Sequence, residues 1–393
     1  MNAPMIAPEP VVDSSSRADR ISSLDLVRGL VMVLMAIDHV RVYSGVPAGG
    51  PSPGVFFTRW VTHFCAPAFV FFAGAAAFLY GRKVGDKRVL ARYLVTRGLL
   101  LVALELTVIR FAWTFNFDYA HFVLAGVIWM LGWCMVLLAG LIWLPTRAVG
   151  VLGLVTITFQ QVFSLAPRML PQAIRTSVGW LWEFIYSSGL DTPPPIVVLY
   201  VLVPWIGVMA VGYAFGDIML RDTNERRRLC LRIGLSATAL FLVIGGLAVI
   251  LQPAPANAPP ALFRLLNQQK YPASQLFLLM TLGPTIALLP LAERARGRLA
   301  GVLTTFGRVP LFYYLLHIPV IHITALVAWY LREGSVHAEY FKTAPYAQVP
   351  PEHRWGLPLL YLVFVIVIAL LYFPCRWFAE VKARHPKGWL SYL

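Results

Sequence analysis

The chain has 393 residues, of which 59% are hydrophobic and only 13% are charged, and its formal net charge is +15. Soluble globular domains carry about 25% charged residues, so these proportions exclude an ordinary soluble domain and indicate that lipid surrounds most of the chain. The basic residues lie in short clusters between apolar runs and are not interleaved with stacking aromatic side chains, which excludes a nucleic-acid-binding protein.

The N-terminal segment, residues 1–20, is rich in Pro, Ala and Ser and lacks the apolar stretch of a signal peptide. We therefore predict a disordered cytoplasmic tail. Residues 21–393 are expected to form a single transmembrane domain.

Ten apolar segments follow the tail, and each approaches the roughly 20 residues that a membrane-spanning helix needs. The ninth contains Pro310 and Pro319, so we expect it to be kinked or broken. The sequence thus predicts an all-α, polytopic membrane protein of about ten helices. The predicted segments are 24–43, 56–80, 89–113, 119–144, 148–165, 195–220, 229–251, 274–292, 299–331 and 357–378.

The distribution of basic residues predicts how these helices are oriented. The tail and alternate connecting segments contain 21 Lys and Arg residues, whereas the outer ends and loops contain ten. Because cytoplasmic loops are enriched in Lys and Arg, we expect both termini to be cytoplasmic, in a cell inner membrane. The longer outer segments are 166–194, a Trp-rich candidate for the membrane interface, and 252–273.

The four cysteines lie far apart, and the chain has no C-x-x-C motif. The sequence therefore supports neither a disulfide framework nor a cysteine-based zinc site, and we predict no metal site. The cysteines are Cys65, Cys134, Cys230 and Cys375.

The first apolar segment ends in "IDHVR", which places Asp38, His39 and Arg41 inside a hydrophobic run. Such a charge at a helix centre costs about 2.5 to 3.5 kcal/mol on insertion scales, so these groups normally face a bundle interior or a watery cavity. One residue advances a helix by about 100°. Asp38 should therefore pair with Arg41, three positions on, rather than with His39.

The second apolar segment carries Arg59 and His63, which lie four positions apart on one helix face. At 1.5 Å per residue, His63 lies about 10 Å below the outer surface, a depth similar to that of His39. We therefore predict that two antiparallel helices bring these two imidazoles to one level.

Further polar residues are expected at the same level. Asp118 and His121 open the fourth segment, Lys270 and Tyr271 precede the eighth, and Glu105 lies in the third. His317 and His322 are about 140° apart on a helix, which argues against a bis-histidine haem or metal site there. The ninth segment supplies Tyr313, Tyr314, His317 and His322.

The basic inner loop around Arg88 and Arg92 has two interpretations. It is either a topology determinant or a binding site for an anionic cytosolic ligand such as the phosphates of coenzyme A. Under the second interpretation, changing both residues to Gln raises the apparent KM for acyl-CoA.

Six ordered blocks resemble the bacterial branch of the heparan-alpha-glucosaminide N-acetyltransferase catalytic-domain family. The resemblance covers about residues 20 to 393. The blocks are "SLDLVRGLVMVLMAIDHVR", "RWVTHFCAPAFVFFAG", "YVLVPWIGVMAVGYAFG", "KYPASQLFLLMTLGP", "FGRVPLFYYLLHIPVIH" and "CRWFAEVKAR".

The resemblance implies an integral membrane acyltransferase that moves an acetyl group from cytosolic acetyl-CoA to an extracytoplasmic sugar or amino-sugar acceptor. It implies a histidine acting as base or transient acyl carrier. In lysosomal members that histidine lies between the first two helices, where this chain has "VPAGGPSPG" and no histidine. The role is therefore reassigned to His39 or to His63, or it is absent from this chain. Of these we favour His39, with His63 as its partner and Arg59 stabilising negative charge.

The other expected roles concern the acceptor and the closure of the cavity. Five residues are expected to line the acceptor side, while Tyr313 and His317 are expected to close the cavity from the ninth segment. A homo-oligomer is left open. The five acceptor-side residues are Asp38, Arg41, Asp118, His121 and Lys270.

Two other functions compete with acyl transfer. A transporter for small anions, coupled to protons, would use the same buried His, Asp and Arg residues, although the chain shows no convincing internal repeat. A haem or quinone redox protein is the second alternative.

Overall fold

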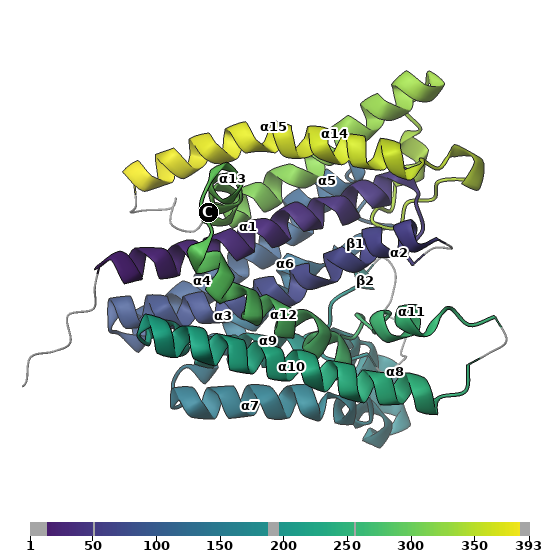
Figure 1. Cartoon of the computed structure of the whole chain (residues 1–393). Helices are drawn as coiled ribbons and strands as arrows, with labels where there is room; N and C mark the ends of the chain where they lie inside the picture. Colours follow the sequence, from purple (N-terminus) through teal and green to yellow (C-terminus); the bar gives the residue numbers. More distant parts are fainter. Residues whose placement is uncertain (1–13, 50–51, 188–195, 255–256, 386–393) are drawn as a thin grey trace, which may run out of the picture.

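The computed structural model describes residues 14–49, 52–187, 196–254 and 257–385. These residues form a bundle of helices that mostly run along one common direction (Figure 1). The helices in the first half of the chain are α1 (Ser14–Ser44), α2 (Pro53–Trp60), α3 (Cys65–Val84), α4 (Lys87–Leu104), α5 (Arg110–Thr114), α6 (Val127–Leu141), α7 (Thr146–Thr158) and α8 (Gln172–Val178). Those in the second half are α9 (Val203–Phe215), α10 (Thr223–Leu251), α11 (Ala261–Leu266), α12 (Gln275–Arg294), α13 (Arg298–Arg308), α14 (Pro310–Glu333) and α15 (Leu357–Arg384).

Six helical segments among the described residues are long and apolar enough to cross a membrane, and α6 and α7 are shorter apolar helices. The chain is therefore a multi-pass membrane protein. The predicted count of ten spans and the cytoplasmic placement of both termini stay predictions. The six segments are Pro53–Val84, Val203–Leu220, Thr223–Leu251, Gln275–Arg294, Pro310–Glu333 and Leu357–Arg384.

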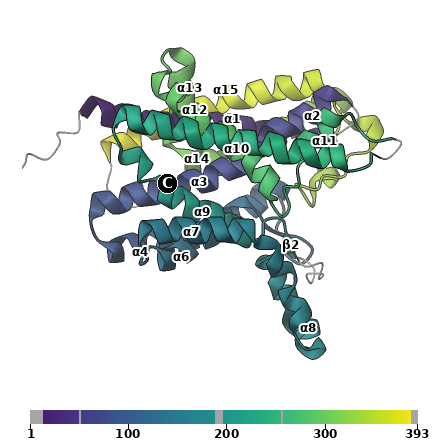
Figure 2. The ribbon, with the colours of Figure 1, turned by 60° about the horizontal axis from the view of Figure 1, so that its bottom comes forward.

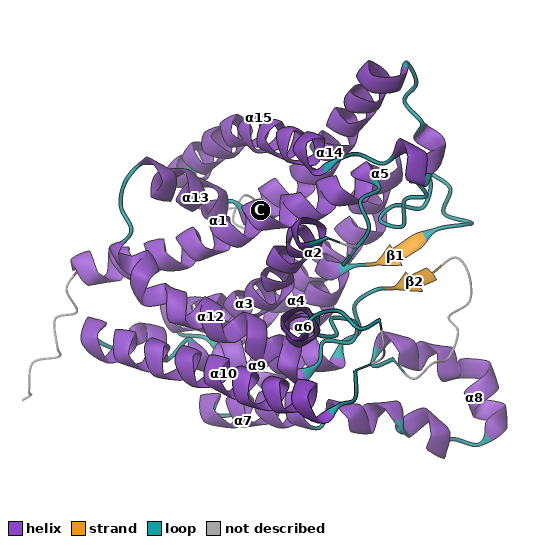
Figure 3. Cartoon of the chain, turned by 45° about the vertical axis from the view of Figure 1, so that its right-hand side comes forward, coloured by secondary structure: helices purple, strands orange, loops and turns teal. Residues whose placement is uncertain are grey.

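Two predicted helix starts are wrong because short strands replace the first turns. β1 (Val123–Ala125) pairs in parallel with β2 (Ile196–Val198), at the end of the bundle seen in Figure 3. Helix α6 therefore begins at Val127 rather than at 119, and α9 begins at Val203 rather than at 195. Both strands consist of apolar residues, and hydrophobicity alone does not distinguish so short an apolar run from a helix.

The last residues of the predicted tail belong to a helix. Helix α1 begins at Ser14, so residues 14–20 are helical, while residues 1–13 lie outside the described residues.

The predicted break in the ninth segment is confirmed. Helix α13 ends at Arg308, Val309 has the non-helical φ of −127°, and α14 starts at Pro310. Proline is favoured at the first helical position because the backbone N–H that it lacks would have no hydrogen-bond partner within the helix there.

Helix α1 is the centre of the bundle. It packs against α3, α12, α13, α14 and α15. Its crossing with α13 is very close, because a Cβ atom on Gly29 would lie 1.8 Å from the carbonyl oxygen of Leu303. From Ser22 to Ser44 no residue of α1 is exposed, so the polar side chains of this part of the helix are surrounded by protein.

Segment 166–187 leaves the bundle. Figure 2 shows α8 extending away from the main body. The segment exposes apolar side chains such as Leu170, Ile174 and Leu181, and its location at the membrane interface stays a prediction.

Candidate functional site

A polar cavity opens beside the last third of α1, and we call it the His39 cavity. Its volume is about 450 Å³, which lies within the range common for small-molecule sites. Its polar lining comprises Asp38, His39, Arg41, Arg59, Thr62, Glu105, Tyr200, Lys270, Tyr271, Tyr314 and Tyr346. The predicted residues Asp38, His39, Arg41, Arg59 and Lys270 are thus brought together.

The ring of His39 is held by His317 of α14. The two nitrogens His39 Nδ1 and His317 Nε2 are 2.7 Å apart, and His317 Nδ1 lies 2.6 Å from the carbonyl oxygen of Tyr314. The indole of Trp113 meets the His39 ring edge to face at a centroid distance of 5.0 Å.

The tautomers of His39 and His317 follow from the carbonyl oxygen of Tyr314, which is the final acceptor of their hydrogen bonds. A carbonyl oxygen only accepts, so His317 Nδ1 carries the hydrogen and donates it to Tyr314. In the neutral ring His317 Nε2 then accepts, and His39 Nδ1 must donate to it. This leaves His39 Nε2 with a lone pair, which is the form that a general base or nucleophile needs.

The predicted pairing of Asp38 with Arg41 is confirmed. Arg41 Nε donates to Asp38 Oδ1 at 2.8 Å, and Arg41 Nη1 donates to the carbonyl oxygen of Val46 at 2.8 Å. Arg59 Nη1 lies 3.9 Å from the same carboxylate oxygen. Arg41 is therefore used to hold the end of α1, while Arg59 keeps more of its donors for other partners.

The loops at this end of the bundle complete the cavity. Lys270 is buried, with Nζ 5.2 Å from the centroid of the Tyr271 ring. Burial raises the pKa of Tyr346 to about 12, so its phenol stays protonated and able to donate near neutral pH. The three cations Arg41, Arg59 and Lys270 outnumber the lining carboxylates, Asp38 and Glu105.

The prediction that His63 lies beside His39 is not met, because His63 does not line the His39 cavity. Among the described residues it is absent from the lining of the His39 cavity. Its ring is buried against Phe277 at 5.5 Å between centroids, and Nδ1 has no hydrogen-bond partner among the described residues. The imidazole next to His39 is His317 instead, from a helix 278 positions away.

Tyr313 also faces away from the cavity. Its hydroxyl donates to the carbonyl oxygen of Met32 at 3.1 Å, which ties α14 to α1. The adjacent Tyr314 lines the cavity in its place.

Asp118 and His121 lie in an exposed loop rather than at the start of a helix. His121 Nδ1 is 2.7 Å from Asp118 Oδ1, and neither residue lines the His39 cavity. The hydrogen bond from His121 holds the pKa of the Asp118 carboxyl below its usual range.

Glu105 is a site residue whose role the sequence did not reveal. Its carboxylate accepts from the backbone N–H groups of Ile128 and Trp129 at 2.9 and 3.2 Å. It therefore caps the N-terminus of α6, where the helix dipole favours negative charge. The one sequence feature that could have identified Glu105 as a site residue is its position inside an apolar segment.

A second, largely apolar cavity of about 190 Å³ adjoins the first, and we call it the apolar cavity. Phe69, Val127 and Tyr314 line both cavities. The only charged side chains in its lining are Arg28 and Arg97.

Arg88 and Arg92 do not reach the apolar cavity. Both are exposed on α4 and absent from its lining, whereas Arg97, five positions after Arg92, is half-buried and lines it.

His322 faces other partners than His317 does, as predicted. Its Nδ1 lies 3.1 Å from the carbonyl oxygen of Ala112, and its ring stacks on Phe115.

Comparison with known families gives one match. The family described as heparan-alpha-glucosaminide N-acetyltransferase, catalytic, matches residues 20–251, which is more than half of the chain. No curated protein matches the chain.

Proposed function

Because the chain belongs to the heparan-alpha-glucosaminide N-acetyltransferase catalytic family, we propose that it transfers an acetyl or related acyl group from acyl-CoA to a sugar-like acceptor. The donor would enter from the cytosol and the acceptor from the other side of a cell inner membrane. The observation that carries this proposal is the pair of adjoining cavities. One is apolar with arginines in its lining, and the other is polar and contains His39.

The apolar cavity suits the donor. Its aliphatic and aromatic lining would accept the acyl group and the thioester arm of acyl-CoA. Arg28 and Arg97 would meet anionic groups of the donor, since guanidinium groups bind phosphate well. Arg28 is held by Asp25 at 3.1 Å and by the carbonyl oxygen of Gly307 at 3.0 Å, so it is fixed in place.

The His39 cavity suits the acceptor and the reaction. His39 Nε2 would take the proton from the acceptor amine or hydroxyl as that atom attacks the thioester carbonyl carbon. The C–S bond then breaks, and the proton passes from His39 to the departing thiolate to give free coenzyme A. A covalent route would begin with attack by the same nitrogen.

The cations of the cavity would stabilise the oxyanion that forms during attack. Arg59 and Lys270 are better placed than Arg41, because Arg41 already donates to Asp38 and Val46. Preorganised donors of this kind contribute a large part of many enzymatic rate enhancements.

The proposal is tested with purified full-length protein in detergent, supplied with acetyl-CoA and a panel of amino sugars. We expect acceptor-dependent release of free coenzyme A thiol, and its loss in the His39→Asn variant. His385→Ala serves as the matched control, since His385 is exposed at the end of α15. No thiol release with any acceptor, together with uptake of a small anion into proteoliposomes, would support the transporter instead.

The donor site has its own test. Arg97→Gln should raise the apparent KM for acetyl-CoA by roughly tenfold, the loss expected for one charge-assisted contact. Arg88→Gln and Arg92→Gln should change it little. The reverse pattern would move the donor to the exposed inner loop.

A further inference from the structure

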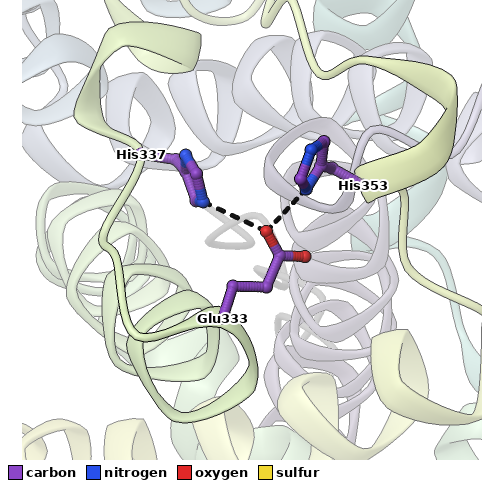
Figure 4. A group of neighbouring side chains, drawn as sticks. All are labelled: Glu333, His337 and His353. Atoms are coloured by element: carbon purple, nitrogen blue, oxygen red, sulfur yellow. Dashed lines mark hydrogen bonds and ion pairs between the residues drawn. The ribbon is translucent and has the colours of Figure 1, made fainter.

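Two histidines and one glutamate converge where α14 ends (Figure 4). Glu333 is the last residue of α14, His337 follows four positions later, and His353 lies in the loop before α15. His337 Nε2 is 3.0 Å and His353 Nδ1 is 2.6 Å from the same oxygen, Glu333 Oε2. One possible ligand atom from each residue lies within 4.8 Å of the others.

The backbone brings His337 back onto the helix end. Gly334 ends α14 in the left-handed region with φ +72°, and His337 itself has φ +48°. Such a φ is uncommon for a residue other than glycine, although His is among the residues enriched there. The cost of this conformation is offset by the contacts that the imidazole makes.

A second carboxylate meets the far side of the same ring. His337 Nδ1 lies 3.1 Å from Glu339 Oε1. A neutral imidazole has one N–H, and a carboxylate only accepts, so a neutral His337 can satisfy one of its two carboxylate contacts. Both contacts are satisfied only if the ring carries two protons or if Nε2 binds a cation.

The surroundings hold the cluster in place. Tyr340 stacks on His337 at 4.9 Å, and Arg332 donates to the carbonyl oxygen of His353 at 2.9 Å. Arg332 Nε is also 3.4 Å from Glu333 Oε1, which leaves Oε2 as the oxygen that faces the histidines. Metal-binding histidines commonly give their other ring N–H to a carboxylate, as His337 would give its Nδ1–H to Glu339.

We propose that Glu333, His337 and His353 bind one divalent transition-metal ion, for which zinc is the best fit. Two imidazoles and one carboxylate suit zinc and its neighbours, whereas calcium and magnesium prefer all-oxygen ligands. Zinc–ligand distances of about 2.0–2.2 Å place tetrahedral ligand atoms roughly 3.3 Å apart. Relative to Glu333 Oε2, the nitrogen of His337 would therefore move out by about 0.3 Å and that of His353 by about 0.7 Å, with water in the fourth position.

The metal would fix the loop that covers the His39 cavity. The segment 334–356 joins the ligands and includes Pro345 and Tyr346, which line that cavity. Within the same segment, Trp355 N–H donates to the carbonyl oxygen of Ser44 at 3.0 Å. None of the three ligands lines the cavity, so zinc binding can be tested whether or not the chain carries out the proposed acyl transfer.

The test uses untagged full-length protein in detergent, stripped with a chelator and titrated with Zn²⁺ by calorimetry. We expect one zinc per chain, and at least tenfold weaker binding in His337→Ala and in His353→Ala. His385→Ala removes a histidine far from the cluster and should bind zinc like the wild type. Co²⁺ in place of zinc should give the strong visible absorption of a four-coordinate site in the wild type and in His385→Ala, but not in His337→Ala or His353→Ala.

A folding defect is separated from the loss of a ligand by a replacement that restores one. His353→Cys exchanges an imidazole for a thiolate, another zinc ligand, and should recover zinc binding relative to His353→Ala. Failure of the stripped wild type to take up zinc at micromolar concentrations would overturn the proposal. Wild-type zinc affinity in a variant with both His337 and His353 changed to Ala would overturn it as well.

Discussion

Two clusters in this protein each contain a pair of histidines, but the hydrogen bonds of the two pairs end at different acceptors. His39 and His317 pass their hydrogen bonds to the backbone carbonyl of Tyr314, while His337 and His353 both meet the carboxylate of Glu333. A carbonyl is uncharged, so it orders two neutral rings and leaves one basic nitrogen facing the cavity. A carboxylate carries a charge, so it can hold extra protons or a cation between the rings. The final acceptor therefore decides which chemistry a pair of imidazoles can support.

The largest effect is expected at His39. In His39→Asn the amide N–H can still donate to His317, but the nitrogen proposed as base is missing. We expect turnover to fall by about 10²- to 10⁴-fold, the usual contribution of a general base, as measured by release of coenzyme A thiol. Thermal stability should change little, because the hydrogen bond is kept. Turnover within a factor of two of the wild type would exclude His39 as the base.

The next effect concerns His317, which positions the ring of His39. His317→Leu removes the acceptor for His39 Nδ1–H, so the ring can rotate or change tautomer, and misplacement of a reacting group costs about 10²-fold. His317→Gln offers an amide oxygen near the position of Nε2 and should restore most of the activity. Equal activity in the Leu and Gln variants would show that His317 only fills space.

A smaller effect is expected at the carboxylate cluster in metal-free protein. Glu333→Gln replaces a charged acceptor by a neutral one and should reduce the free energy of unfolding by about 1.5–3 kcal/mol, the range for hydrogen bonds to charged groups. The measurement is the shift in Tm of chelator-treated protein. Glu352→Gln, in the neighbouring exposed turn, is the matched control. An equal shift in both variants would mean that Glu333 has no special contacts.

The smallest effect is expected at the exposed pair of Asp118 and His121. The pKa of Asp118 is held below its usual value of 3.8 by the hydrogen bond from His121. A carboxyl with a lowered pKa stabilises the folded protein above its usual pKa, and this contribution disappears as the pH falls through the lowered value. The Tm of His121→Ala should therefore lie slightly below that of the wild type at neutral pH.

In acid the same two proteins should have nearly equal Tm values. A difference in Tm that grows as the pH falls to about 3 would contradict the assignment of this contact.

Features that depend on one helix could be predicted from the sequence. The Asp38–Arg41 pair follows from helical spacing, and the break at Val309 follows from the proline beside it. The membrane helices themselves follow from long apolar runs.

Features that depend on packing between distant segments could not be predicted. Similar depth suggested that His39 meets His63, but the rotation of each helix about its axis is set by its neighbours. Helix α14 places His317 beside His39, across 278 positions. His353 likewise reaches Glu333 only through the path of the loop 334–356. The starts of α6 and α9 were missed because the strand pairing that replaces their first turns is also a distant contact.

Phe69, Val127 and Tyr314 stand where the two cavities adjoin. Under the proposed function, only the narrow thioester arm of acyl-CoA needs to pass this point. The nucleotide of the donor would stay on the side of the apolar cavity, and the sugar ring of the acceptor would stay in the His39 cavity. Selection between donors would then depend on whether the acyl group is narrow enough to pass between these three side chains. Neither reactant would have to cross the membrane, and no ion-conducting path would need to open during acyl transfer.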